Sequence, residues 1–129
     1  MPAVPPPSRL TKRPNEPRKV TASDYGLLLT TTPNREEAHQ IAKLLIDEKL
    51  AACVQLLPIE SFYFWQGKTQ NEAEILLLVK TRSALFETAI ARIKSVHSYS
   101  VPEIVAMPFT AGFAGYFDWI DGVTILANR

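Results

Sequence analysis

Three side chains in this sequence have the chemistry to bind a transition metal: Cys53, His97 and Glu103. Imidazole suits copper, nickel and zinc, and a thiolate suits soft metals. The chain holds one cysteine and two histidines, so a structural zinc site of the Cys/His type cannot be built within one chain. Any metal site must therefore recruit carboxylates, or ligands from another subunit.

Each of these residues also has a structural interpretation. Cys53 is flanked by the apolar residues of an expected strand, where a cysteine is usually inert packing. His97 follows an apolar helical stripe, so its ring can cap the C-terminus of that helix. Glu103 begins an apolar strand, where an unpaired carboxylate is costly to bury. We expect Glu103 to pair with Lys68, Lys80 or Tyr99.

Lys68, Glu74 and Trp65 form a second group of interest. Lys68 and Glu74 either form a salt bridge or line a cleft between subunits, where a small anion or a metal ion binds. Trp65 lies near an expected hairpin tip, where exposure to solvent would be unusual, so we expect it to be buried against another subunit. His39 lies off the apolar face of its helix, and we assign it no role.

Standard enzyme motifs are missing from the sequence, which has no GxGxxG, no Ser-His-Asp ordering and no HExxH. A Cys53/His97 pair could support nucleophilic catalysis only if the two side chains were adjacent in the fold. We therefore expect a binding protein rather than an enzyme.

The elements that must position these residues are predicted in the order β-α-β-β-α-β. Residues 25–31 form a short apolar run that predicts a buried strand. An amphipathic helix of about four turns follows, capped by Thr32 or Asn34. Two strands flank Gln66-Gly67, a pair that fits a tight hairpin turn. Pro58 interrupts the first of these strands, which indicates a bulge or an edge strand.

The second half of the chain repeats the plan. Ser83 can cap a second helix that ends near His97, and Pro102 prevents its continuation. A core strand over residues 103–107 follows, and a C-terminal extension contains a short helix. This order is the α+β, ferredoxin-like sandwich. The second hairpin strand is apolar on both faces toward its end, which favours an oligomer because a small domain seldom covers both.

Composition separates an N-terminal arm from one domain. Residues 1–22 hold six of the ten prolines and a net charge of +4, and we expect this arm to be disordered. The arm is either a plain solvated tail or a remnant of a targeting peptide. Residues 23–129 form a single domain with a net charge of −3, which offers no nucleic-acid surface. The single cysteine favours a reducing, cytoplasmic location, and no apolar run is long enough to cross a membrane.

Five segments resemble the CutA divalent-cation-tolerance family, in the right order and spacing: LAACVQ at 50–55, FYFWQGK at 62–68, EILLLVKT at 74–81, HSYSVPEIV at 97–105 and YFDWI at 116–120. The resemblance covers roughly residues 25–121. It implies a ferredoxin-like protomer in a tight homotrimer similar to the PII signalling proteins, with the hairpin and the C-terminal segment at subunit contacts. Lys68, Glu74, Trp65 and Trp119 also match the family pattern.

The resemblance implies a role in tolerance or binding of copper or another divalent cation, with no obligatory cofactor. His97 matches a copper-linked histidine of the family, although Val96 and Thr30 replace a histidine and a cysteine that some members carry. Ser98 and Ser100 likewise replace a proline and a glutamate of the common HPYEVPE motif. The alternatives are a PII-like module that binds a small molecule near Lys68, Tyr99 and Glu103, and a trimeric scaffold without a metal role.

Overall fold

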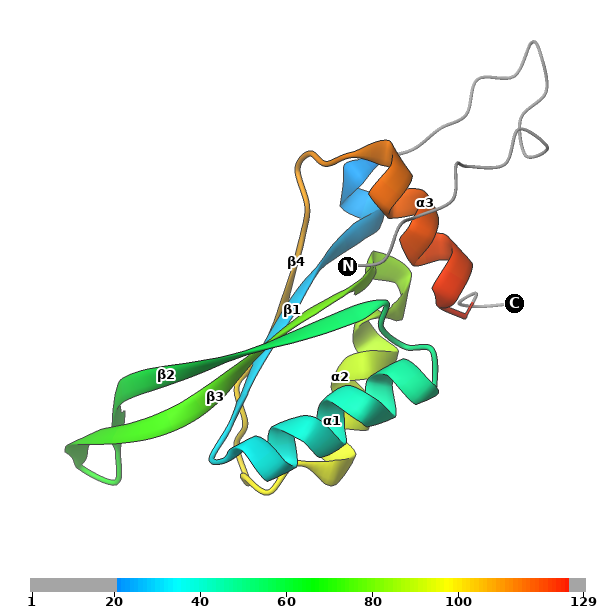
Figure 1. The fold of residues 1–129 in the computed structure, drawn as a ribbon. Coiled ribbons are helices and arrows are strands. Elements are labelled where there is room, and N and C mark those ends of the chain that lie inside the picture. Colours follow the sequence, from blue (N-terminus) through cyan, green and yellow to red (C-terminus); the bar gives the residue numbers. More distant parts are fainter. Residues whose placement is uncertain (1–20, 126–129) are drawn as a thin grey trace, which may run out of the picture.

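The computed structural model describes residues 21–125, so all but the last two residues of the predicted arm, residues 1–22, lie outside the described residues, and Ala22 opens a short 3₁₀ turn, Ala22–Asp24. The strands and helices follow the predicted order β-α-β-β-α-β and end with one more helix (Figure 1). Their bounds are β1 Tyr25–Thr32, α1 Arg35–Asp47, β2 Cys53–Trp65, β3 Lys68–Arg82, α2 Phe86–Val96, β4 Ile104–Pro108 and α3 Ala114–Val123. The four strands form one antiparallel sheet in the order β2-β3-β1-β4, so the ferredoxin-like plan is confirmed.

Helices α1 and α2 pack side by side on one face of the sheet (Figure 1). Alternate strand residues point toward them, because successive side chains of a strand face opposite sides. The predicted apolar stripes of both helices supply the other half of this core. Its fully buried members include Leu28, Leu77, Val79, Ile41, Leu45 and Ile93.

Within residues 21–125, the opposite face of the sheet is covered at one end only, by α3. There Phe117 stacks on Tyr25 with ring centroids 4.5 Å apart. Arg82 ties α3 to β3 by hydrogen bonds to the Thr124 hydroxyl and to the Asp121 carbonyl, and the Tyr25 hydroxyl donates to the Asp121 carboxylate. Away from α3, this face carries the hydrogen-bonded pair Gln55 and Lys80 and a larger set of apolar, at least partly exposed residues, Leu27, Leu29, Leu57, Leu76, Leu78, Val105 and Met107.

Strands β2 and β3 form a long hairpin that projects beyond the helices (Figure 1). The predicted turn is confirmed: Gln66 and Gly67 have φ values of 52° and 82°, which the tight hairpin turn requires. Pairing runs one to one from Cys53 opposite Lys80 to Trp65 opposite Lys68. Of the two alternatives predicted for Pro58, the bulge is therefore wrong and the edge strand is confirmed, since among the described residues β2 has a neighbour on one side only.

The two long helices begin differently. Asn34 caps α1, where its side-chain oxygen accepts a hydrogen bond from the Glu37 N–H at 2.8 Å, as predicted. The predicted cap of α2 is wrong, because Ser83 starts a 3₁₀ turn, Ser83–Leu85, that precedes the helix. The Ser83 hydroxyl donates instead to the carbonyl of Ser23, 60 residues away in the sequence.

Candidate functional site

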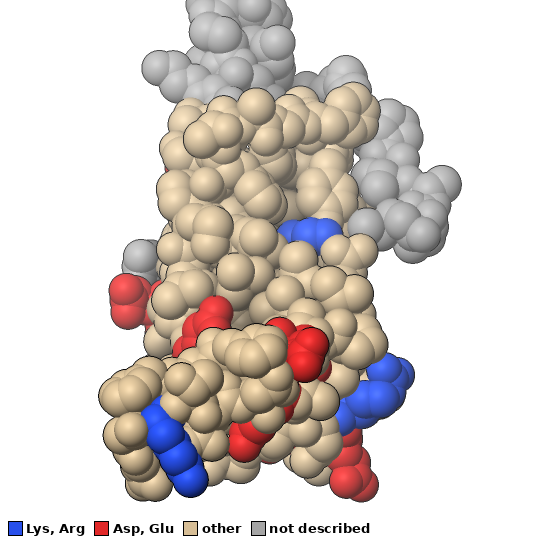
Figure 2. Space-filling model, turned by 90° about the vertical axis from the view of Figure 1, so that its left-hand side faces the viewer, with Lys and Arg blue, Asp and Glu red and all other residues tan. Residues whose placement is uncertain are grey.

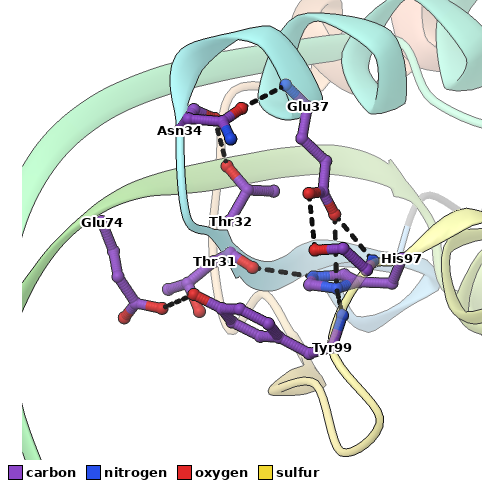
Figure 3. Close-up of polar contacts among 8 residues, drawn as sticks. Thr31, Thr32, Asn34, Glu37, Glu74, His97 and Tyr99 are labelled. Carbon is purple, nitrogen blue, oxygen red and sulfur yellow. Dashed lines mark hydrogen bonds and ion pairs between the residues drawn. The ribbon is translucent and has the colours of Figure 1, made fainter.

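His97 lies at the end of α2, as predicted, but its ring does not cap the helix carbonyls. The side chain is fully buried. Nε2 lies 2.8 Å from the Thr31 carbonyl oxygen, and Nδ1 lies 3.1 Å from the Tyr99 backbone nitrogen (Figure 3). The carbonyl can only accept and the backbone N–H can only donate, so Nε2 carries the proton and Nδ1 is an acceptor. Both ring nitrogens are therefore engaged.

Glu37 anchors the loop that follows α2 to the first turn of α1. Its carboxylate accepts hydrogen bonds from the Ser98 N–H at 2.9 Å and from the Ser98 hydroxyl at 2.7 Å. One of its oxygens lies 3.5 Å from Nδ1 of His97. Sequence reasoning assigned Glu37 no part in the site and missed this contact. Nothing local in the sequence indicates a partner 61 residues away.

Tyr99 connects the loop after α2 to the hairpin. Its hydroxyl donates to the Glu74 carboxylate at 2.7 Å, and the Ser61 hydroxyl donates to the other oxygen of Glu74 at the same distance. Glu74 is only 9% exposed, so these two donors are what make its burial tolerable. Burial, reinforced by the negative charge of Glu74, raises the pKa of Tyr99 well above its ordinary value.

The prediction that Glu103 is a buried carboxylate at the start of a strand is wrong. β4 begins at Ile104, and Glu103 is exposed in the preceding loop rather than buried in a strand. Its expected partners are engaged elsewhere, because Tyr99 binds Glu74 and Lys80 binds Gln55. The buried carboxylate that needed a hydroxyl partner is Glu74.

An open groove of about 1050 Å³ lies between the hairpin and the loop that follows α2. Its charged lining consists of four glutamates, Glu60, Glu72, Glu74 and Glu103, and one lysine, Lys68. Its aromatic lining is Phe62, Tyr63, Trp65 and Tyr99. Figure 2 shows acidic side chains, with a few lysine or arginine side chains near them, over the lower part of this face, below a broad area largely without charge.

None of the four groove glutamates forms an ion pair with a lysine or arginine in the described part of the chain. Their hydrogen-bond donors are neutral: Tyr63 donates to Glu72 at 2.7 Å, and the Asn71 amide donates to Glu60 at 3.2 Å. The hydrogen bond to Glu72 also raises the pKa of Tyr63. The groove therefore keeps a net negative charge.

The structure brings together five of the eight residues singled out from the sequence. Lys68, Glu74, Trp65, Tyr99 and Glu103 all line the groove. Lys68 and Glu74 form no salt bridge within the described chain, because they are six positions apart on β3. Trp65 is 45% exposed in the single chain, so its burial against another subunit stays a prediction.

His97, Cys53 and Trp119 lie outside the groove. His97 lies behind it and contacts two of its lining residues, the Thr31 carbonyl and the Tyr99 N–H. Cys53 pairs with Lys80, whereas the Thr31 that holds His97 pairs with Leu76, so about 13 Å of β3 separates the two places. Cys53 and His97 are therefore not adjacent, and they cannot form a nucleophile–base pair. Among residues 21–125, no three His, Cys, Asp or Glu side chains are grouped to hold a metal ion.

Cys53 instead lies under α3. Burial raises the pKa of Tyr116 to about 12, and the neighbouring Cys53 thiol adds to the effect. Tyr116 in turn packs on Trp119, with ring centroids 5.6 Å apart. The packing interpretation of Cys53 fits these surroundings.

Comparison with known proteins identifies one family. A family model described as CutA1 divalent ion tolerance protein matches residues 26–123. A divalent-cation tolerance protein CutA from Archaeoglobus fulgidus is 43% identical over 97 residues, which are 75% of this chain and 95% of that protein. A chloroplastic CutA from Arabidopsis thaliana is 42% identical over 99 residues, but the chain spans only 54% of its length.

Solved structures agree with the fold. The crystal structure of CutA1 from Oryza sativa superposes with a TM-score of 0.78 at 40% identity, and the match covers 82% of this chain and 98% of that one. A structure described as the periplasmic divalent cation tolerance protein CutA from Archaeoglobus fulgidus gives a TM-score of 0.76 at 42% identity, covering 77% and 97%. In the described part of this chain, no helix is both long and apolar enough to span a membrane.

Proposed function

The chain belongs to the CutA1 divalent ion tolerance protein family, and from this membership we propose that it binds divalent cations weakly in the groove. The observation that carries the proposal is the set of four groove glutamates, none of which forms an ion pair with a lysine or arginine of residues 21–125. The strand register puts Glu72 and Glu74 on one face of the hairpin and Glu60 on the other, and carboxylates without a cationic partner around one groove concentrate cations there. The role is binding rather than catalysis.

The donor set of the groove determines which cations fit best. Carboxylate oxygens suit magnesium, calcium and manganese, whereas copper prefers imidazole and thiolate. Residues 21–125 of one chain assemble no group of three such side chains, so water or a neighbouring subunit would supply the remaining ligands. Binding of copper by His97 and Cys53 stays a prediction from the family resemblance. It requires His97 to release Thr31 and Tyr99.

We further propose that the protein is a homotrimer, with the uncovered sheet face and the hairpin at the subunit contacts. The support is the amount of exposed apolar surface: Phe62 and Phe64 on the hairpin are 67% and 72% exposed, and Leu57 on the sheet is 51% exposed. Exposed apolar patches of this kind are typical of protein interfaces. Light scattering at micromolar concentration tests this proposal, and a monomeric mass rejects it.

Calorimetric titration tests the cation site. Wild-type protein should give saturable heat with Mn²⁺, and the Glu60→Gln/Glu103→Gln variant should lose most of it. The Glu36→Gln/Glu87→Gln variant is a matched control, since both residues are exposed and lie on α1 and α2. Equal Mn²⁺ binding by the groove variant and the control would reject the groove as the site. For copper, His97→Ala is compared with the exposed His39→Ala.

A small organic ligand is the second candidate, favoured by the size of the groove. A volume of about 1050 Å³ exceeds what a single ion needs and falls at the upper end of small-molecule sites. Lys68 and the Tyr99 hydroxyl would then contact the ligand in a PII-like module. A thermal-shift screen of nucleotides and metabolites tests it, because a ligand that binds only the folded state raises the melting temperature. If neither cations nor metabolites bind, the scaffold alternative is favoured.

The cellular location stays a prediction. The single cysteine supports a cytoplasmic location, whereas the Arabidopsis thaliana relative is described as chloroplastic and the Archaeoglobus fulgidus structure as periplasmic. Fractionation of cells that express the tagged protein tests it.

A further inference from the structure

Lys80 is a charged residue in apolar surroundings. It lies on the open face of the sheet, the face away from α1 and α2, together with Leu76 and Leu78, because alternate residues of β3 point to the same side. In the neighbouring strand β1 it pairs with Leu27. Its ammonium group donates to the side-chain oxygen of Gln55, and within residues 21–125 it forms no ion pair with a carboxylate. The positive charge of Lys80 therefore has only a neutral partner.

The homotrimer proposed above would bury this charge. The open face is the surface that we assign to subunit contacts, and moving a lysine from water into an apolar interface is costly unless a carboxylate pairs with it. The amide of Gln55 accepts a hydrogen bond but does not neutralise the charge. The interface therefore needs an anionic group close to Lys80.

The groove glutamates of the same chain lie too far away to supply this group. Glu74 lies on the same face of β3 as Lys80 but six positions away, which is about 20 Å along an extended strand. Glu72 and Glu60 lie still further out along the hairpin. Glu103 precedes β4 at one edge of the sheet, whereas the Lys80 ammonium group is turned toward β2 at the other edge. The counter-charge must therefore come from outside the chain.

A cyclic trimer can bring the opposite charges together. In a ring of identical subunits, each contact joins one part of a chain to a different part of the next chain. The open face is basic near α3, where Lys80 lies, and acidic at the hairpin end, where Glu72 and Glu74 lie with Glu103 across the groove. Contact between these two ends pairs the charges at all three interfaces. Charge complementarity of this kind fixes how two surfaces meet, and here it favours a second copy of the chain as the partner.

We propose that Lys80 of a neighbouring copy enters the acidic groove and pairs there with Glu72 and Glu103, so that the groove is complete only in the assembled protein. These two acids are exposed, whereas Glu74 already accepts two hydrogen bonds within its own chain. The inference rests on the proposed homotrimer. With Lys68 and one neighbouring lysine against four glutamates, the groove keeps a net charge of −2, so the inference does not exclude cation binding.

Subunit exchange between ¹⁴N- and ¹⁵N-labelled protein, followed by native mass spectrometry, tests the proposal. Lys80→Met should speed exchange at least about tenfold, because removing one partner of a buried charge pair raises the dissociation rate. A folded Lys80→Met protein that no longer assembles is the limiting form of this result. Lys80→Arg keeps the charge and should exchange at close to the wild-type rate. Lys94→Met removes an exposed lysine of α2 and is the matched control, which should exchange like the wild type.

A second background identifies the partner of Lys80. In Glu72→Gln/Glu103→Gln, little counter-charge remains in the groove, so Lys80→Met should lose most of its effect on exchange. In the control background Glu36→Gln/Glu87→Gln, which changes exposed acids of α1 and α2, Lys80→Met should act as in the wild type.

Two results would overturn the proposal while leaving the homotrimer in place. One is exchange that Lys80→Met leaves unchanged or slows, since an unpaired buried lysine would give that result. The other is an equal effect of Lys80→Met in the groove background and in the control background. A monomeric wild-type protein would instead reject the homotrimer and this inference together.

Discussion

The hydrogen bond between Tyr99 and Glu74 is the contact whose removal tests the site most directly. Tyr99→Phe keeps the ring and removes one of the two hydroxyls that hold a carboxylate only 9% exposed to solvent. A hydrogen bond to a charged group contributes about 1.5–3 kcal/mol, and a buried acceptor left without a donor costs a similar amount. Ser61 still serves Glu74, so we expect Tyr99→Phe to lower the free energy of unfolding by about 2 kcal/mol.

The partner change supplies the control. Glu74→Gln removes the charge but keeps an acceptor, and in the double variant the loss of the Tyr99 hydroxyl should cost much less. We expect a coupling energy of about 1 kcal/mol or more between the two positions. Urea unfolding at one fixed protein concentration measures all four proteins, since an oligomer's stability depends on concentration. Losses that add within about 0.5 kcal/mol would refute the pairing.

Three further results are expected. Gly26→Ala should lower the free energy of unfolding by about 1–3 kcal/mol, because the added methyl would lie 2.4 Å from the Met107 carbonyl oxygen. Gly122→Ala is the control: this glycine lies in α3, the added methyl has no neighbouring atom within 4 Å, and the change should be neutral or stabilising in the same assay. Arg82→Met should lower the free energy of unfolding measured in urea by about 2 kcal/mol and detach α3, because the carboxylate of Asp121 loses its cation and Thr124 loses its hydrogen-bond donor. An unchanged unfolding midpoint would contradict the role of Arg82 in holding α3 to β3. The pKa values of Tyr25, Tyr63, Tyr99 and Tyr116 are all raised, so absorbance at 295 nm should show little tyrosinate at pH 10 in the folded protein and ordinary ionisation in urea. The free energy of unfolding should therefore be retained below pH 10 and fall as the pH rises further. A titration of the folded protein centred near pH 10 would contradict the raised pKa values.

The fold was predictable because its signals are local and repeated. The switch from helical spacing in α1 to alternation in β3 and the Gln66-Gly67 turn each depend on neighbouring residues. The two errors depend on distant partners. The sequence does not show that the Ser83 hydroxyl binds the distant carbonyl of Ser23, so Ser83 looked like an ordinary helix cap. Pro58 leaves its strand regular because β2 is an edge strand.

The site was predicted as a set of residues but not as a set of contacts. Tyr99 and Glu74 were both singled out, yet their pairing depends on how the loop after α2 crosses the sheet, 25 positions from Glu74. Because that crossing was unknown, the sequence favoured Glu103 as the buried acid. Glu37 and Ser61 were missed for the same reason, since glutamate and serine are ordinary surface residues until a partner faces them.

The position of His97 explains why this histidine can matter without binding a metal. Its ring joins β1 to the loop after α2, and that loop holds Tyr99 against Glu74 and hence against the hairpin. To bind a metal ion through one of its nitrogens, the His97 ring would have to turn outward. The Thr31 carbonyl and the Tyr99 N–H would then lose their hydrogen-bond partner. Each such loss costs about 1–3 kcal/mol, so the two together reduce metal affinity by at least about 30-fold relative to a free imidazole. His97→Ala should therefore change the free energy of unfolding more than it changes the free energy of copper binding. An exposed imidazole such as His39 can bind a metal without this cost.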